Sequence, residues 1–128
     1  MPGAGMSGLS AQHELNQTLI DWQRSVLEQQ DVNMAAAKAE AEYRTLKAKA
    51  LTTAKFEDPK ISLGLAEALA EAKPEVADAL TNRLITAARA DSLRSRLQWF
   101  RARADSYRSE IATDRAASQL YADNRGTT

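Results

Sequence analysis

Cysteine is absent from the 128 residues, and the chain has one histidine, three prolines and five glycines. The lack of cysteine excludes disulfides and thiolate chemistry and is compatible with a cytoplasmic protein, which we expect. His13, the single imidazole, cannot form a metal cluster or a nucleophile–base pair by itself. Gly64 is the only glycine between Gly8 and Gly126, so the sequence has no phosphate-binding glycine loop. We therefore predict a protein that is not an enzyme and has no cofactor or metal.

Aromatic residues are also rare, at 5% of the chain, and no apolar run approaches the roughly 18–20 residues that span a membrane. The first ten residues show neither the basic nor the apolar part of a signal peptide. The 17 basic and 17 acidic side chains give a net charge of zero, so the chain as a whole is not a polycation directed at nucleic acid. We expect thin, alanine-rich helical packing and no membrane partner.

The spacing of apolar residues predicts an all-α fold, a long antiparallel helical hairpin or coiled coil with a short connecting helix. The two long segments have similar lengths, which favours folding back on each other. An extended helix that pairs only with other copies is the alternative. The expected parts are a disordered N-terminal arm (1–9), a helical hairpin domain (10–124) with helices over about 11–55, 59–72 and 74–123, and a disordered tail (125–128).

Two prolines mark the expected ends of the connecting helix. Asp58 fits an N-cap and Pro59 the first helical position. Within this helix Ile61, Leu65 and Leu69 step by four residues. Proline disfavours the α conformation of the residue before it, so we expect an irregularity at Lys73-Pro74. Either the helix ends there and a new one begins, or one continuous helix is kinked.

The first long helix shows two apolar frames. Its second half restarts in a shifted frame at Ala36, which predicts a stammer in the coiled coil. We expect Glu14, Asp21 and Glu28 on the side opposite the first apolar face. That face comprises Leu15, Leu19, Trp22 and Val26, with Ile20, Leu27 and Met34 beside it.

The strongest periodicity is a heptad seam that starts at Leu93 and ends at Tyr121. Two helices alone bury little apolar surface, so we expect a homo-oligomer, most simply a dimer that forms a four-helix arrangement. The residues predicted to line the oligomer seam are Leu93, Leu97, Phe100, Tyr107 and Ile111.

Arginines flank this seam on both sides. The e positions hold Arg94, Arg101, Arg108 and Arg115, and the g positions hold Arg89, Arg96 and Arg103. In an antiparallel hairpin we expect the opposing shoulder to hold the neutral Asn16, Gln23 and Gln30. The arginines are then either solvated flanks or a surface for an acidic protein partner or single-stranded nucleic acid. Trp99, outside the seam at a c position, could stack on a base, anchor a protein contact or pack in an oligomer. The interaction candidates are Arg89, Arg94, Arg96, Trp99, Arg101, Arg103 and Arg108.

Two stretches, 41–50 (AEYRTLKAKA) and 92–109 (rich in Arg and Ser), carry a resemblance to known proteins. Together they resemble the small Ala/Lys/Arg-rich helical proteins that tailed bacteriophages encode in their early regions, near recombination and replication genes. The resemblance implies a phage accessory protein in the host cytoplasm, acting beside single-stranded DNA machinery or on a host factor. It carries no catalytic residues.

Three functions follow from these observations. The first is a non-enzymatic coiled-coil protein that binds a partner protein. The second is a single-stranded nucleic-acid-binding accessory that uses the arginines and Trp99. The third is a structural assembly subunit.

Overall fold

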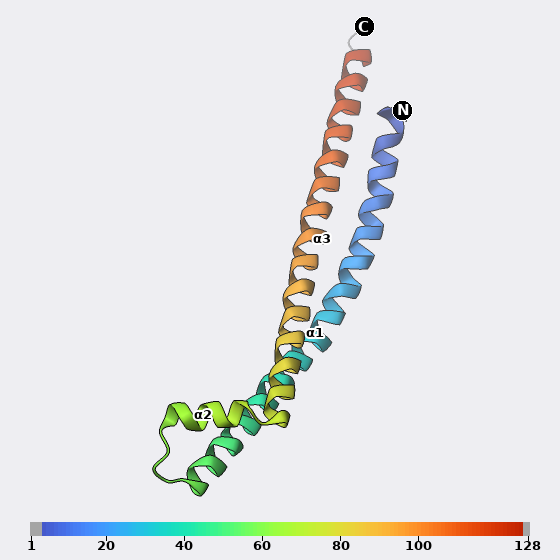
Figure 1. The fold of residues 1–128 in the computed structure, drawn as a ribbon. Helices are drawn as coiled ribbons and strands as arrows, with labels where there is room; N and C mark the ends of the chain where they lie inside the picture. The colour runs from blue at the N-terminus through green and yellow to red at the C-terminus, as the bar shows by residue number, and fades with distance from the viewer. Residues whose placement is uncertain (1–3, 127–128) are drawn as a thin grey trace. The chain divides into compact units, whose positions relative to one another are not determined.

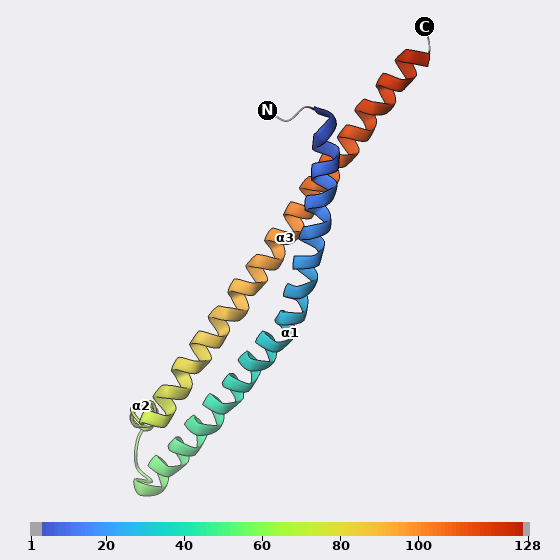
Figure 2. The ribbon, with the colours of Figure 1, turned by 90° about the vertical axis from the view of Figure 1, so that its right-hand side faces the viewer.

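The computed structural model describes residues 4–126, with side chains from Leu9 to Asn124. These residues form three helices: α1 (Ala4–Glu57), α2 (Leu63–Glu71) and α3 (Pro74–Gly126) (Figure 1). The predicted all-α architecture, two long packed helices joined by a short one, is confirmed. The chain divides into a connector unit, Glu28–Leu93, and a terminal unit, which comprises the described residues 4–27 and 94–126. Within each unit the segments of α1 and α3 run in opposite directions (Figure 2).

The long helices extend beyond the predicted ends. α1 begins at Ala4, so residues 4–9 of the predicted arm have a helical backbone, and α3 continues to Gly126. Once a helix is nucleated, each added residue gains a backbone hydrogen bond, which allows α1 to extend beyond the predicted start near residue 11. Residues 1–3 of the predicted arm and 127–128 of the predicted tail lie outside the described residues.

The connecting helix starts later than predicted. The Asp58 carbonyl accepts from the Ile61 N–H at 3.0 Å, and the Asp58 carboxylate accepts from the Lys60 N–H at 3.1 Å. These bonds form a turn with Pro59 at its second position, a site that suits proline's restricted φ as well as a helix start does. The N-cap of α2 is Ser62, whose hydroxyl accepts from the Leu65 N–H at 3.2 Å. The predicted cap at Asp58 is therefore wrong.

At Lys73-Pro74 the helix is interrupted, so α2 and α3 are separate helices. α2 ends at Glu71 and α3 begins at Pro74. The Lys73 carbonyl accepts from the N–H groups of Val76 and Ala77, at 3.1 and 3.0 Å. Pro74 has no N–H and occupies the first helical position, where that group would have had no partner.

One uninterrupted heptad frame of buried and half-buried residues runs along α1, so the predicted stammer is absent. The prediction followed the bulky Leu19 and Val26, whereas the helix buries the small polar Thr18 and Ser25 at 6% exposure each. Val26 is exposed, and Leu19 only half-buried. The buried frame comprises Ala11, Leu15, Thr18, Trp22, Ser25, Gln29, Val32, Ala36, Ala39, Tyr43, Leu46, Ala50 and Thr53.

The frame along α3 agrees with the predicted seam over most of its length. It also continues upstream of Leu93 to Val76, and it stops at Asp114, since Tyr121 is 65% exposed. Its members are Val76, Ala79, Arg83, Thr86, Ala90, Leu93, Leu97, Phe100, Ala104, Tyr107, Ile111 and Asp114.

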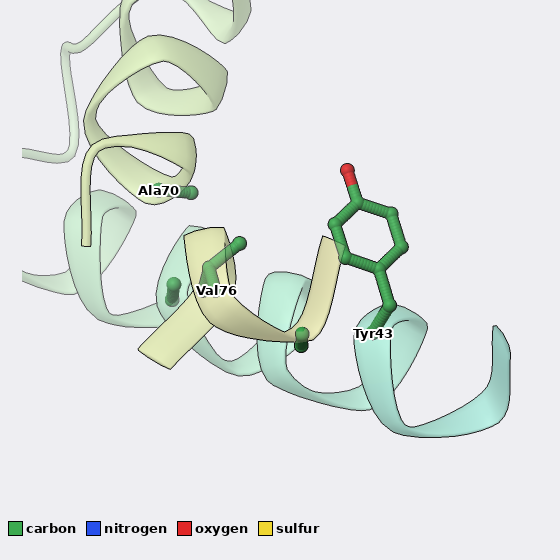
Figure 3. Packing of buried hydrophobic residues seen from close by; sticks show 5 residues of the cluster. Tyr43, Ala70 and Val76 are labelled. Carbon is green, nitrogen blue, oxygen red and sulfur yellow. The ribbon is translucent and has the colours of Figure 1, made fainter. Parts of the chain in front are cut away.

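The hydrophobic cluster of the connector unit draws on all three helices (Figure 3). Its buried members are Tyr43, Ala50, Ala70, Val76 and Ala79. Three of these five are alanines, whose small side chains let helix backbones approach closely. The tight packing leaves Val76 only 1% exposed and Ala70 fully buried.

Candidate interaction surface

The predicted oligomer seam lies within the packing of the single chain. Leu93, the last residue of the connector unit, is 3% exposed. Leu97, Phe100, Tyr107 and Ile111 belong to the terminal unit, where each is half-buried. The hairpin itself therefore accounts for much of the burial of these side chains. Contact of this seam with a second copy stays a prediction.

The arginine shoulders of α3 are exposed, and the structure changes what flanks them in the terminal unit. In the observed α1 frame, Asn16 and Gln23 occupy b positions, which are exposed. The g positions hold Glu14 and the half-buried Asp21. Like positions face each other in an antiparallel pair, so these acids flank the same side of the seam as the g-position arginines. The prediction that Asn16 and Gln23 form the opposing shoulder is wrong, because it depended on the wrong α1 frame, whereas the e positions of the observed frame hold the neutral Gln12, Leu19 and Val26.

Trp99 lies in a row of stacked side chains along α3. The guanidinium carbon of Arg103 is 5.2 Å from the centroid of the Trp99 ring and 5.2 Å from that of Tyr107. The spacing of four residues places successive members on one helix face. The Phe100 ring meets the Trp99 ring edge-on, with centroids 5.2 Å apart and an interplanar angle of 66°. Trp99 is still 53% exposed, so a large aromatic side chain is held in place at the surface.

The terminal unit as a whole is nearly balanced in charge, whereas the part of α3 around this row is basic. Over the described side chains 9–27 and 94–124 there are seven arginines and six acidic residues, a net charge of +1, but residues 94–108 hold five arginines and one acid, Asp105. Arg108 donates to the Asp105 carboxylate at 3.3 Å, and both side chains are more than half exposed. An exposed pair of this kind contributes roughly 0–1 kcal/mol. The net field of the unit is therefore weak, and the arginines form a local basic strip of directional hydrogen-bond donors.

Arg89 is separated from the other six interaction candidates, because it belongs to the connector unit. There it lines an open hollow of about 160 Å³ together with Asp31, Val32, Ala35 and Thr86. The Thr86 hydroxyl donates to the carbonyls of its own helix, at 2.9 and 3.0 Å, and is not available to orient a ligand. The hollow has few polar groups and suggests no chemistry.

The connector unit holds an apolar surface that the sequence reasoning missed. Ala66 and Ala70 of α2 are fully buried, whereas Leu65 and Leu69 are 54% and 49% exposed. The predicted Ile61–Leu65–Leu69 face is thus not the face that packs inward. The available signal was the Ala66–Ala70 pair, four residues apart, which permits a closer approach to neighbouring helices than leucine does.

Among the described residues, no three histidine, cysteine or acidic side chains gather where they could hold a metal ion. The described helices include none with the length and apolar character that crossing a membrane requires. No family model, no curated protein and no solved structure matches this chain.

Proposed function

We propose that this chain is a non-enzymatic interaction protein that binds an acidic partner protein through the α3 surface around Trp99. The observation that supports the proposal most directly is the Phe100–Trp99–Arg103–Tyr107 row, in which an exposed tryptophan contacts a ring and a guanidinium group of its own helix. Tryptophan, tyrosine and arginine are the residues most enriched at binding hot spots. A side chain that is already ordered loses little conformational entropy when a partner covers it.

The exposed g-position arginines of the same helix complete this surface. Arg96 and Arg103 lie seven residues apart on the shoulder of α3 next to Trp99, whereas the e-position arginines lie about 160° away around the helix. Guanidinium groups bind carboxylates in a planar, two-bond geometry, which gives orientation as well as attraction. A partner with spaced Asp or Glu side chains beside an apolar pocket for Trp99 fits this arrangement.

A second candidate, single-stranded nucleic acid, is favoured by the proximity of these arginines to Trp99. Two observations weigh against it. The terminal unit as a whole has a net charge of only +2, with eight arginines and six acids over residues 4–27 and 94–126, whereas binding to a phosphate backbone depends on several uncompensated cations. A base that stacks on Trp99 must also compete with Arg103, which already lies against the ring. The bacteriophage setting stays a prediction based on the resemblance alone.

The test compares three baits in quantitative affinity capture from the source cells: the natural chain, a Trp99→Ala variant and a Leu120→Ala control. Leu120 is 65% exposed on the same helix, so its loss removes a similar exposed apolar group away from the row. We expect at least one acidic protein to be retained by the natural chain and the control and lost at least tenfold with Trp99→Ala. Identical capture by all three baits would contradict the proposal.

Fluorescence anisotropy with a labelled single-stranded oligonucleotide, at about 50 and 200 mM salt, distinguishes nucleic-acid binding from binding of an acidic protein. We expect no binding at the lower salt. Tight binding that weakens steeply with salt and fails after Arg96 and Arg103 are changed to glutamine would favour nucleic acid instead.

A further inference from the structure

The outward face of α2 is apolar, although it lies at the surface. α2 buries Ala66 and Ala70 and exposes Leu65 and Leu69. The neighbouring outward positions, Gly64, Ala68 and Ala72, are also exposed, and none of the five outward residues is charged. The charged residues of α2 are Glu67, which is half-buried, and the exposed Glu71, which pairs with Lys47 of the same unit. The remaining outward surface of α2 is apolar and is not covered by the chain itself.

Two further large apolar side chains of the connector unit are exposed. Phe56, near the end of α1, is 86% exposed, and Leu63, the first residue of α2, is 59% exposed.

We propose that a second copy of this chain covers this face, with the two α2 helices packed antiparallel about a two-fold axis near Ala68 and Leu69. A two-fold interface joins the same patch on both copies, so a charged face would meet its own charge. The five outward residues of α2 avoid this conflict because none of them is charged. This face also lacks the charges by which a surface selects a foreign partner.

The charges at the two ends of α2 select the antiparallel arrangement. The segment before α2 (55–60) has two lysines and two acids, whereas the segment from Glu71 to Asp78 has three acids and one lysine. A parallel pair places these acidic segments side by side. An antiparallel pair places each acidic segment near Lys60 and the positive N-terminal end of the other α2 helix. The small Ala68 near the axis allows the two helices to approach closely.

The first test is the molar mass of the full chain by light scattering or sedimentation between about 1 and 200 μM. We expect the natural chain to be a dimer at the upper end of this concentration range. The Leu65→Glu/Leu69→Glu variant should stay monomeric over the whole range, because the new charges meet across the axis. Leu120→Glu, at 65% exposure in the terminal unit, is the matched control and should dimerise normally. Circular dichroism checks that the variants keep their helix content, since both leucines are half exposed in the single chain.

The second test uses the natural absence of cysteine. A single Ala68→Cys substitution should give a disulfide-linked dimer under mild oxidation, because the two thiols lie near the axis, whereas Ala116→Cys on α3 should cross-link at least tenfold less. A natural chain that stays monomeric at the highest concentration would overturn the proposal. So would a dimer that survives Leu65→Glu/Leu69→Glu and does not cross-link through position 68. Neither result depends on the Trp99 surface.

Discussion

The connector and terminal units use the same two long helices but bury their side chains to different extents. In the connector unit a third helix is present, and Ala66, Ala70 and Val76 are at most 1% exposed. In the terminal unit the α3 seam has six positions, and only one of them, the small Ala104, is fully buried. The other five, which include Leu97 and Phe100, are half-buried. Two helices enclose small side chains more readily than bulky ones, and Leu15, at 8% exposure, is the one large apolar residue that is buried among the described residues of the terminal unit. Side-chain size therefore matters as much as apolar character in deciding what this fold buries.

The two units also differ in how they hold their arginines. In the connector unit, Arg83 forms an ion pair with Glu40 and lies 5.0 Å from the Tyr43 ring, so the cation joins α3 to α1. In the terminal unit, Arg103 stacks on rings of its own helix. The first arrangement stabilises the contact between helices, and the second shapes an exposed surface. We therefore expect stability to depend mainly on the connector unit and partner binding mainly on the terminal unit.

The largest expected effect is a buried charge in the connector unit. Val76→Asp should lower the free energy of unfolding by about 3–5 kcal/mol, because the carboxylate has no cation to compensate it. Urea unfolding followed by circular dichroism measures the change. Ala77→Asp, one residue further at an exposed position, should change it by less than about 0.5 kcal/mol. Equal losses in both variants would show that Val76 is not a core residue.

Removal of the Tyr43 ring should be the next largest effect. The ring is 6% exposed and contacts two cations, so Tyr43→Ala should destabilise the fold by about 3 kcal/mol. Tyr121→Ala is the matched change in the terminal unit, at 65% exposure, and we expect a change within about 0.5 kcal/mol. The comparison of the two units fails if the two tyrosines prove equally important.

A small stabilisation should follow from Ser25→Ala in the terminal unit. Ser25 is 6% exposed in the α1 seam, and alanine has the higher helix propensity, so we expect a gain of about 0.5 kcal/mol. Thermal unfolding measures it, with Ser95→Ala, at an exposed site, as the control for propensity alone. A clear loss of stability in Ser25→Ala would indicate that the hydroxyl is needed in the seam.

The smallest effect concerns the Lys47–Glu71 ion pair, whose Nζ–Oε1 distance is 3.3 Å. The hydrogen bond to Glu71 raises the pKa of Lys47 above its ordinary 10.5, and the nearby Tyr43 adds to the shift. A raised lysine pKa stabilises the fold below about pH 10.5, and this contribution is lost as the pH rises through the folded-state pKa. Both groups are largely solvated, so the stability change will be slight.

NMR titration of the Lys47 side chain tests this effect in the natural chain and in Glu71→Gln. We expect a lower Lys47 pKa in the variant, because the hydrogen bond to the Glu71 carboxylate is the main cause of the shift. An unchanged Lys47 pKa would contradict the assignment of Glu71 as the main cause.

The sequence was informative where large apolar residues alone define the spacing, as on α3 from Leu93 to Ile111. It misled on α1, where Leu19 and Val26 suggested a different frame from the one that buries Thr18 and Ser25. Pro59 was compatible with both a helix start and a turn, and the local hydrogen bonds of Asp58 favoured the turn. Hydrophobicity ranks leucine above alanine and serine, but close helix packing favours the smaller residues.

By itself the sequence determined the all-α architecture of two long segments joined by a short helical one and the heptad positions of the α3 arginines, because these depend on local backbone preference and spacing. The structure decided that Lys73-Pro74 is a break between α2 and α3 and not a kink. Only the tertiary structure decided which face of α2 points inward. That choice depends on how closely three helices can approach, and Ala66 and Ala70 allow an approach that Leu65 and Leu69 would prevent. It also decided that Trp99 is held at the surface, because the position of its ring depends on Phe100 and Arg103 together.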